Sequence, residues 1–274
     1  LRILGARVPP VFGRARATQM RREFEREASD GVDLSVEAAV GLLRGVDSAF
    51  AGRTTSYRLT NVPEAVDFAF DSGEQRVTTR SAEAVVIDVA TKGGADALSP
   101  EARERLLASD LRIDAEADAF ASLLPAEVRD GSPTLRAEAL AKRVHDLIEP
   151  RGTVAIQTAS QVLETGEGDC TEYALAFVAA LRHHGIPARF VSGVKMDESG
   201  KFIPHQWVQY WNDSEFVDVD LTTPTMLVGA GHIQLFNHAL PEHPQFVHAL
   251  DQLTIEPLPP TSQAPDHGAA IDFN

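Results

Sequence analysis

The clearest pattern of hydrophobic and polar positions in the chain is helical and covers residues 170–184. Apolar side chains recur there at i, i+3, i+4 and i+7, which predicts one buried face of a helix. The residues of this face are Ala174, Phe177, Val178 and Leu181. Gly185 is a typical residue for the end of a helix, and Pro187 cannot continue one. We therefore expect a helix that begins at Cys170 and ends before Gly185.

The pattern then changes to one typical of strands. Runs rich in β-branched and aromatic residues cover 187–196, 202–211 and 216–221. The turn-forming sequences DESGK and NDSE separate them, so consecutive strands are expected to pair antiparallel. One helix followed by three antiparallel strands predicts an α+β core.

Two further patterns precede this core. Residues 55–62 and 83–91 are strand-like and are separated by the turn sequence DSGEQ, which indicates a small β-rich segment. Ser99 and Ser132 are each followed by proline and then by a helical pattern, so each is expected to cap a helix.

The ends of the chain differ from its middle. Residues 1–32 are charged, and within them the segment QMRREFEREASDG interleaves Arg and Glu as a solvated helix would. Residues 33–46 have amphipathic helical spacing. We expect an N-terminal helical and β-rich region over 1–111, a core domain over 112–257, and a proline-rich flexible tail over 258–274.

Composition and charge exclude several classes of function. The formal net charge of −15 argues against nucleic acid as a partner and against an anionic membrane surface. No apolar stretch approaches the roughly 18–20 residues that a membrane span needs. The single cysteine excludes a disulfide scaffold and leaves the redox compartment open.

That cysteine, Cys170, lies in the sequence GEGDCTEYALAF, where a glycine-rich turn leads into the predicted helix. Asp169 and Glu172 have the spacing of a capping box, which would place Cys170 in the first turn. The positive end of a helix favours a thiolate and can hold an oxyanion. The two acidic neighbours oppose this effect, so a nucleophilic Cys170 needs a base. The glycines are expected to let the backbone approach a substrate closely.

His205 is the candidate base, because it lies on the second predicted strand, and the third strand carries a carboxylate that can reach it. Strict alternation puts His205 and Trp207 on one face. Asp218 and Asp220 also share a face, so the pattern alone does not choose between them. A carboxylate that orients the imidazole would complete a Cys–His–Asp set. Without these partners, Cys170 would be interpreted as a small buried apolar residue.

The segments TGEGDCTEYALAFVAALRHHGIPARF, HQWVQYW and FVDVDLTTPT occur in the order typical of one family. Together they resemble the bacterial transglutaminase-like superfamily, over roughly residues 112–257. The resemblance implies a papain-like core, in which a Cys-bearing helix packs on an antiparallel sheet. It assigns the triad to Cys170, His205 and Asp220, because the family's Asp is followed by x-Thr, as in Asp220-Leu221-Thr222.

The resemblance also implies a second oxyanion donor upstream of the cysteine, for which Gln161 is a candidate, with Trp207 as a candidate wall of the substrate groove. Tyr173 and Gln209 depart from the usual family residues and are expected to alter that groove. No metal or organic cofactor is implied.

The expected function is thiol-dependent acyl transfer on peptide or protein amides through a Cys-thioester. Water would give a protease or amidase and an amine would give a transglutaminase; the resemblance favours hydrolysis. It also favours an extracytoplasmic location over a cytoplasmic one. The alternative is a non-enzymatic scaffold or peptide-binding module. The substrate and the oligomeric state do not follow from the sequence.

Overall fold

The computed structural model describes residues 2–3, 6–7, 55–62, 71–89, 97–152, 156–197, 200–223, 226–240, 250 and 252–258. Two short strands, β1 (Arg2–Ile3) and β2 (Ala6–Arg7), pair antiparallel. The helices predicted before residue 47, and the predicted tail beyond residue 258, lie outside the described residues.

Helix α5 (Cys170–His183) is the central helix of the fold. Every residue from Glu172 to Arg182 is buried, so the helix is enclosed well beyond its predicted apolar face. Gly185 adopts a φ of +75°, which favours glycine, and Ile186 N–H donates to the Leu181 carbonyl at 2.9 Å. The predicted helix and its glycine stop are confirmed.

The other helices begin at polar caps. Helices α2 (Pro100–Leu107) and α3 (Pro133–Leu147) start after Ser99 and Ser132, whose side chains accept backbone N–H groups as expected. Helix α4 (Ala159–Thr165) was not predicted, although it has a complete capping box from Thr158. Two 3₁₀ helices, η1 (Asp118–Phe120) and η2 (Ala126–Val128), complete the helical layer.

The central sheet has the strand order β10-β9-β8-β11. Strands β8 (Ala188–Met196), β9 (Phe202–Trp211) and β10 (Phe216–Val219) match the three predicted strands and pair antiparallel. Strand β11 (His232–His238) adds to the free edge of β8 and was not predicted. The α+β prediction is therefore confirmed, with one more strand than expected.

A second four-stranded sheet has the order β12-β3-β5-β4. Strands β3 (Thr55–Thr60) and β5 (Ala84–Val89) were predicted. Strand β4 (Gln75–Arg80) was not, because its sequence QRVTTR lacks an alternating apolar face. Strand β12 (Thr254–Pro257) comes from near the C-terminus and pairs with β3.

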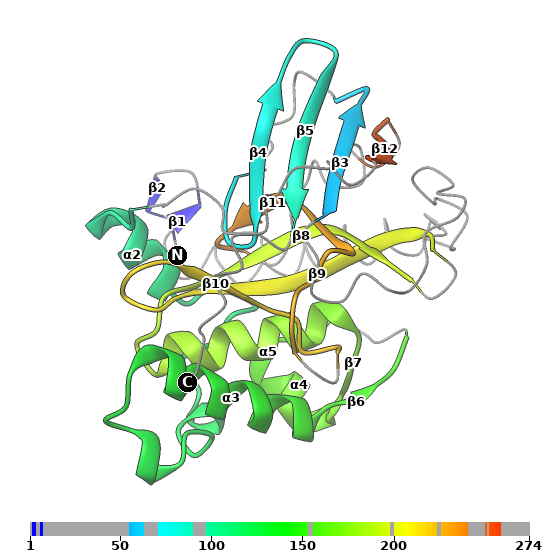
Figure 1. Cartoon of the computed structure of the whole chain (residues 1–274). Coiled ribbons are helices and arrows are strands. Elements are labelled where there is room, and N and C mark those ends of the chain that lie inside the picture. Colours follow the sequence, from blue (N-terminus) through cyan, green and yellow to red (C-terminus); the bar gives the residue numbers. More distant parts are fainter. Residues whose placement is uncertain are drawn as a thin grey trace, which may run out of the picture.

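Figure 1 shows the central sheet between helices α3, α4 and α5 on one side and strands β3, β4 and β5 on the other. One apolar core joins the helices to β8 and β9 through residues such as Phe177, Phe190 and Val208. A second core joins the second sheet to β8, β9 and β11, and it includes Tyr57 and Phe236. The predicted boundary between residues 111 and 112 stays a prediction, but this second core contains residues from both sides of it.

Candidate functional site

Cys170 occupies the first position of α5. The Asp169 side chain accepts a hydrogen bond from the Thr171 backbone N–H at 2.9 Å, and Glu172 accepts one from the Asp169 N–H at 3.2 Å. The predicted capping box is therefore present. It holds the half-buried Cys170 in the first turn, next to the unpaired N–H groups and the positive end of the helix.

The glycines in the turn before Cys170 are required by the backbone conformation and the close packing of the turn itself. Gly166 ends α4 with a φ of +65°, a backbone conformation that favours glycine. A Cβ at Gly168 would lie 2.3 Å from the Cβ of Glu172, so this glycine makes room for the capping residue. Strands β6 (Glu149–Pro150) and β7 (Glu167–Gly168) pair in parallel and hold the turn in place. The predicted approach of a substrate to this backbone stays a prediction.

The predicted base and its carboxylate lie in direct contact. His205 is the fourth residue of β9, and Asp220 follows the last residue of β10. The distance from His205 Nε2 to Asp220 Oδ2 is 2.9 Å, and both side chains are buried. Asp218 instead accepts hydrogen bonds from Trp207 Nε1 at 2.7 Å and Gln209 Nε2 at 2.9 Å. Asp220 is therefore the carboxylate in contact with His205.

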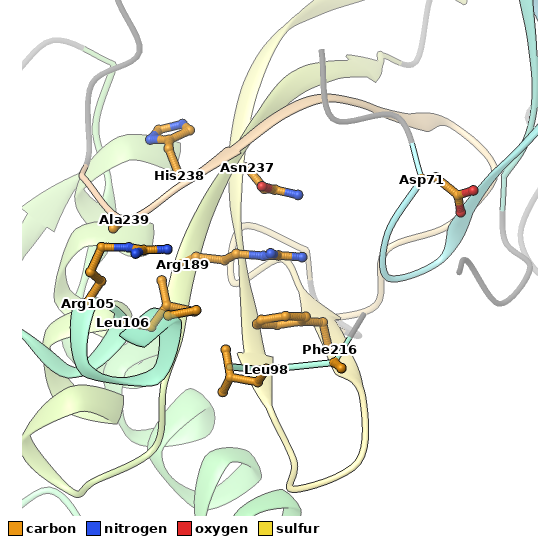
Figure 2. A pocket seen from close by; sticks show the side chains of 11 residues that line it. Asp71, Leu98, Arg105, Leu106, Arg189, Phe216, Asn237, His238 and Ala239 are labelled. Carbon is orange, nitrogen blue, oxygen red and sulfur yellow. The ribbon is translucent and has the colours of Figure 1, made fainter. Parts of the chain in front are cut away.

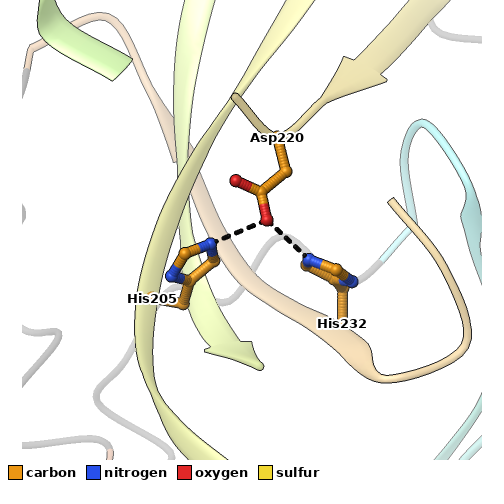
Figure 3. Close-up of side chains that lie close together, drawn as sticks. All are labelled: His205, Asp220 and His232. Atoms are coloured by element: carbon orange, nitrogen blue, oxygen red, sulfur yellow. Dashed lines mark hydrogen bonds and ion pairs between the residues drawn. The ribbon is translucent and has the colours of Figure 1, made fainter. Parts of the chain in front are cut away.

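Two residues that were not predicted join this pair. His232 Nε2 lies 3.0 Å from Asp220 Oδ2, and Lys195 Nζ lies 2.9 Å from the same oxygen. Figure 3 shows the two imidazole rings on opposite sides of the Asp220 carboxylate. The candidate site is thus a cluster around one buried carboxylate.

No sequence motif pointed to His232 or Lys195. They are direct cross-strand partners in the register of β11 and β8. Their approach to Asp220 depends on β11 pairing with the edge of β8 that faces away from β9. That sheet order cannot be deduced from the local pattern of residues 226–240, because periodicity predicts strands but not their neighbours.

The partners of Asp220 determine its charge. Burial alone would raise the pKa of Asp220, but hydrogen bonds from His205 and His232, together with the charge of Lys195, hold this pKa well below its usual range. Thr222 adds a backbone N–H at 2.9 Å and a hydroxyl at 2.7 Å to Asp220 Oδ1. The carboxylate is ionised and satisfied on both oxygens.

The candidate nucleophile and base are both neutral at rest. Burial and, to a smaller extent, the Asp169 charge raise the pKa of the Cys170 thiol to about 12, although a hydrogen bond with the Gln206 backbone opposes the shift. Burial lowers the pKa of His205, although Asp220 opposes this effect. A neutral thiol can act as a nucleophile only if a base removes its proton. The contact with Gln206 places Cys170 beside the chain segment that carries His205.

His205, Asp220 and His232 could also offer three ligand atoms to a metal, since these atoms lie within 4.8 Å of one another. Each Nε2, however, is hydrogen-bonded directly to Asp220 Oδ2. The ammonium group of Lys195 already contacts that oxygen and would repel a cation. The geometry is that of a hydrogen-bonded cluster around an ionised carboxylate.

The remaining predicted site residues have clear structural partners. Gln161 accepts the Thr158 backbone N–H at 3.0 Å and so completes the capping box of α4. Trp207 is 2 % exposed and stacks against His205, with 6.2 Å between ring centroids. Their roles as oxyanion donor and groove wall stay predictions.

The two residues that depart from the usual family pattern are internal. Tyr173 is buried and its hydroxyl donates to the Ile148 carbonyl at 2.5 Å. Gln209 is fully buried and donates to both Asp218 Oδ1 and Gln234 Oε1 at 2.9 Å. In this structure both side chains support the core beneath the site.

A separate pocket of about 440 Å³ lies among α2, β8, β10 and β11 (Figure 2). Its lining includes Arg105, Arg189, Phe216 and His238, and the Arg189 guanidinium lies 3.5 Å from the centroid of the Phe216 ring. None of the predicted triad residues lines this pocket, so it is distinct from the candidate site.

Comparison with known proteins identifies the core of the chain. Residues 124–221 match the model of the transglutaminase-like superfamily, a range that contains Cys170, His205 and Asp220. The resemblance found in the sequence is thereby confirmed for this range. No curated protein sequence matches the chain.

Several solved structures are similar to part of the chain. The periplasmic domain of TgpA from Pseudomonas aeruginosa is 20% identical and has a TM-score of 0.46, with coverage of 63% of this chain and 74% of that one. A candidate cysteine protease from Cytophaga hutchinsonii is 13% identical with a TM-score of 0.38, and coverage is 76% and 82%. Red sea bream transglutaminase is 11% identical with a TM-score of 0.26, and coverage is 61% and 45%. These similarities are too distant to bear on activity.

In the part of the chain that the structure describes, no helix is both long and apolar enough to cross a bilayer.

Proposed function

We propose that this chain is a cysteine-dependent acyl-transfer enzyme that acts on peptide or protein amides, a proposal supported by the match of residues 124–221 to the model of the transglutaminase-like superfamily. The observation that carries the proposal is the buried contact of 2.9 Å between His205 Nε2 and Asp220 Oδ2. It leaves His205 Nδ1 for the proton of Cys170, whose thiol contacts the backbone of the neighbouring Gln206.

In the first half of the proposed reaction, Cys170 Sγ forms a bond to the carbonyl carbon of the amide, and His205 takes the thiol proton. The N–H groups of the first turn of α5 stabilise the negative charge on the carbonyl oxygen. The bond from carbon to nitrogen then breaks, and His205 returns the proton to the leaving amine. Asp220 holds the ring of His205 and stabilises its protonated form.

In the second half, water or an amine attacks the thioester while His205 accepts its proton. The bond from carbon to sulfur breaks, and the proton returns to Cys170, which restores the resting enzyme. We favour water as the acceptor, and so a protease or amidase, on the strength of the family resemblance. The same resemblance favours an extracytoplasmic location.

The proposal can be tested with p-nitrophenyl acetate, a small activated acyl donor. We expect Cys170 to gain one acetyl group, which mass spectrometry of the intact protein and of its peptides would detect. The single cysteine makes this assignment unambiguous. His205→Ala should slow acylation by about 10²–10⁴-fold, since it removes the general base. The matched control is Cys170→Ala, which should gain no thioester.

If the wild-type protein is acylated no faster than a small free thiol, and His205→Ala leaves that rate unchanged, the proposed enzyme is wrong. A scaffold or peptide-binding module would then be the better interpretation. The acceptor is a separate measurement: the acetylated protein is divided between buffer and buffer with cadaverine. Release of acetate in both supports hydrolysis, whereas acetyl-cadaverine as the main product contradicts our preference for water.

A further inference from the structure

Asp220 has more donors than a carboxylate needs if its only role is to orient one histidine. Its Oδ2 is contacted by His205 at 2.9 Å, His232 at 3.0 Å and Lys195 at 2.9 Å. Its Oδ1 accepts two hydrogen bonds from Thr222. Lys195 and His232 come from a cross-strand pair of β8 and β11, so the sheet delivers both to the same oxygen.

The proton of His232 has a defined position. The Gly229 backbone N–H donates to His232 Nδ1 at 3.2 Å, so Nδ1 is an acceptor and the ring proton lies on Nε2. The Nε2–H group then donates to Asp220. The ring is 6 % exposed and packs edge-on against Trp207, with 5.4 Å between ring centroids. His232 is therefore held in one orientation by contacts at both ring nitrogens, with Nδ1 accepting from Gly229 and Nε2 facing Asp220.

Lys195 has a different effect on the same carboxylate. Its ammonium group contacts Asp220 Oδ2 and lies 3.2 Å from Thr222 Oγ1, while the side chain is 22 % exposed. A bare carboxylate would strongly favour the protonated form of His205, and a cation beside it offsets that effect. The titratable groups around His205 are Asp220 after β10, Lys195 on β8 and His232 on β11, and Cys170 at the start of α5 contacts the backbone of the adjacent Gln206.

We propose that Lys195 and His232 are positioning residues, which hold Asp220 in one orientation and set how strongly it favours the protonated form of His205. This inference rests on the proposed function, because its consequence is a base that stays neutral until Cys170 gives up its proton. His232 holds the orientation of the Asp220 carboxylate, and the positive charge of Lys195 offsets the effect of that carboxylate on His205.

The charge can be tested with Lys195→Met, measured by the pH dependence of Cys170 acylation by p-nitrophenyl acetate. Loss of the cation should move the acidic midpoint to higher pH by at least about half a unit, because protonated His205 is no longer repelled. The rate at pH values below the wild-type midpoint should fall several-fold, while the rate at high pH is retained. Lys201→Met is the matched control, since the described contacts give that side chain no partner in the site, and its midpoint should be unchanged.

The geometry can be tested with His232→Leu and His232→Gln. Leucine removes the donor to Asp220, so we expect about a tenfold lower plateau rate and a higher midpoint. Glutamine can still donate and should recover most of the rate. Thermal melts of each variant identify any that do not fold.

A midpoint in Lys195→Met that is unchanged or lower than in the wild type would overturn the inference, even if the variant were less stable. Equal rates for His232→Leu and the wild type would overturn the role of His232. Titration of the His205 ring by NMR gives the same midpoint without any reaction. If Cys170 is not acylated but Lys195→Met still shifts that NMR midpoint, the proposed function fails and the charge effect stands.

Discussion

Two aspartates that lie two residues apart have opposite roles in this protein. Asp220 is held ionised by its donors, and it contacts His205. Burial raises the pKa of Asp218, although hydrogen bonds from Trp207 and from the Glu74 backbone oppose this effect. Asp218 links β10 to the turn before β4 through that Glu74 N–H at 2.9 Å. One carboxylate belongs to the candidate site, and the other supports the sheet beneath it.

Matched substitutions should separate these roles. Asp220→Asn carries no charge, and its amide can accept at only one of the two oxygen positions, so either the imidazole donors or the Thr222 donors face an N–H₂ group. We expect acylation of Cys170 to fall by about 10³-fold or more. Asp218→Asn should keep most of the acylation rate but lower the free energy of unfolding by about 1–3 kcal/mol, because its new N–H₂ group faces the Glu74 N–H. Acylation rates and urea unfolding measure the two effects, and the reverse pattern would contradict the assignment of Asp220.

At the scale of a single element, the start of α5 combines a cap with a titratable group. Glu172 is buried at the third position of the helix, where it accepts the Asp169 N–H. Burial raises its pKa to about 7, and Asp169 adds to the shift, although Arg112 opposes it. The native state therefore holds a proton on Glu172 at pH values where the unfolded chain has lost it.

The pH dependence of stability follows from that shift. The folded pKa of Glu172 lies above the unfolded one, so its contribution is present below about pH 4.5 and is lost as pH rises through about 7. Glu172→Gln can still accept the Asp169 N–H but does not ionise. We expect the variant to be more stable than the wild type by roughly 1–3 kcal/mol near pH 8, and similar to it near pH 4. Urea unfolding across this range measures the difference, and a constant gap at all pH values would count against a raised pKa.

On the scale of the whole molecule, the second sheet and the segment that carries the candidate site share one core. Residues of β3 and β5 pack against β8, β9 and β11, and β12 returns to pair with β3. The Tyr57 hydroxyl donates to the Ala230 carbonyl at 2.8 Å, in the turn just before His232. The N-terminal sheet therefore supports the strand that supplies His232 to the site.

This shared core predicts how the chain tolerates truncation. Removal of residues 1–111 would expose Val194, Phe202 and Leu235, which are fully buried, and would leave β12 without its partner. We expect residues 112–274 alone to show no cooperative thermal transition, because burial of such side chains contributes about 1.5–3 kcal/mol each. Calorimetry of the fragment beside the full chain measures this. A fragment that melts cooperatively and acylates Cys170 would instead support an independent catalytic domain.

The sequence alone determined the helix and strands of the core and the order in which the candidate site residues occur along the chain. Local periodicity and turn residues, which act over a few residues, predict helix α5 with its capping box and strands β8, β9 and β10. They also place a candidate base and candidate carboxylates on neighbouring strands. Strand β4 was missed because its residues are polar, and its pairing with β5 rather than its pattern makes it a strand.

Only the tertiary structure decided which residues meet at the site. The residue pattern left Asp218 and Asp220 equivalent, and the contact with His205 distinguishes them. His232 and Lys195 reach Asp220 because β11 pairs with the outer edge of β8, a non-local arrangement that local periodicity does not encode. The stretch around Cys170 predicts a nucleophile at the start of a helix. The protonation states of that nucleophile and its base depend on burial, which only the packed molecule determines.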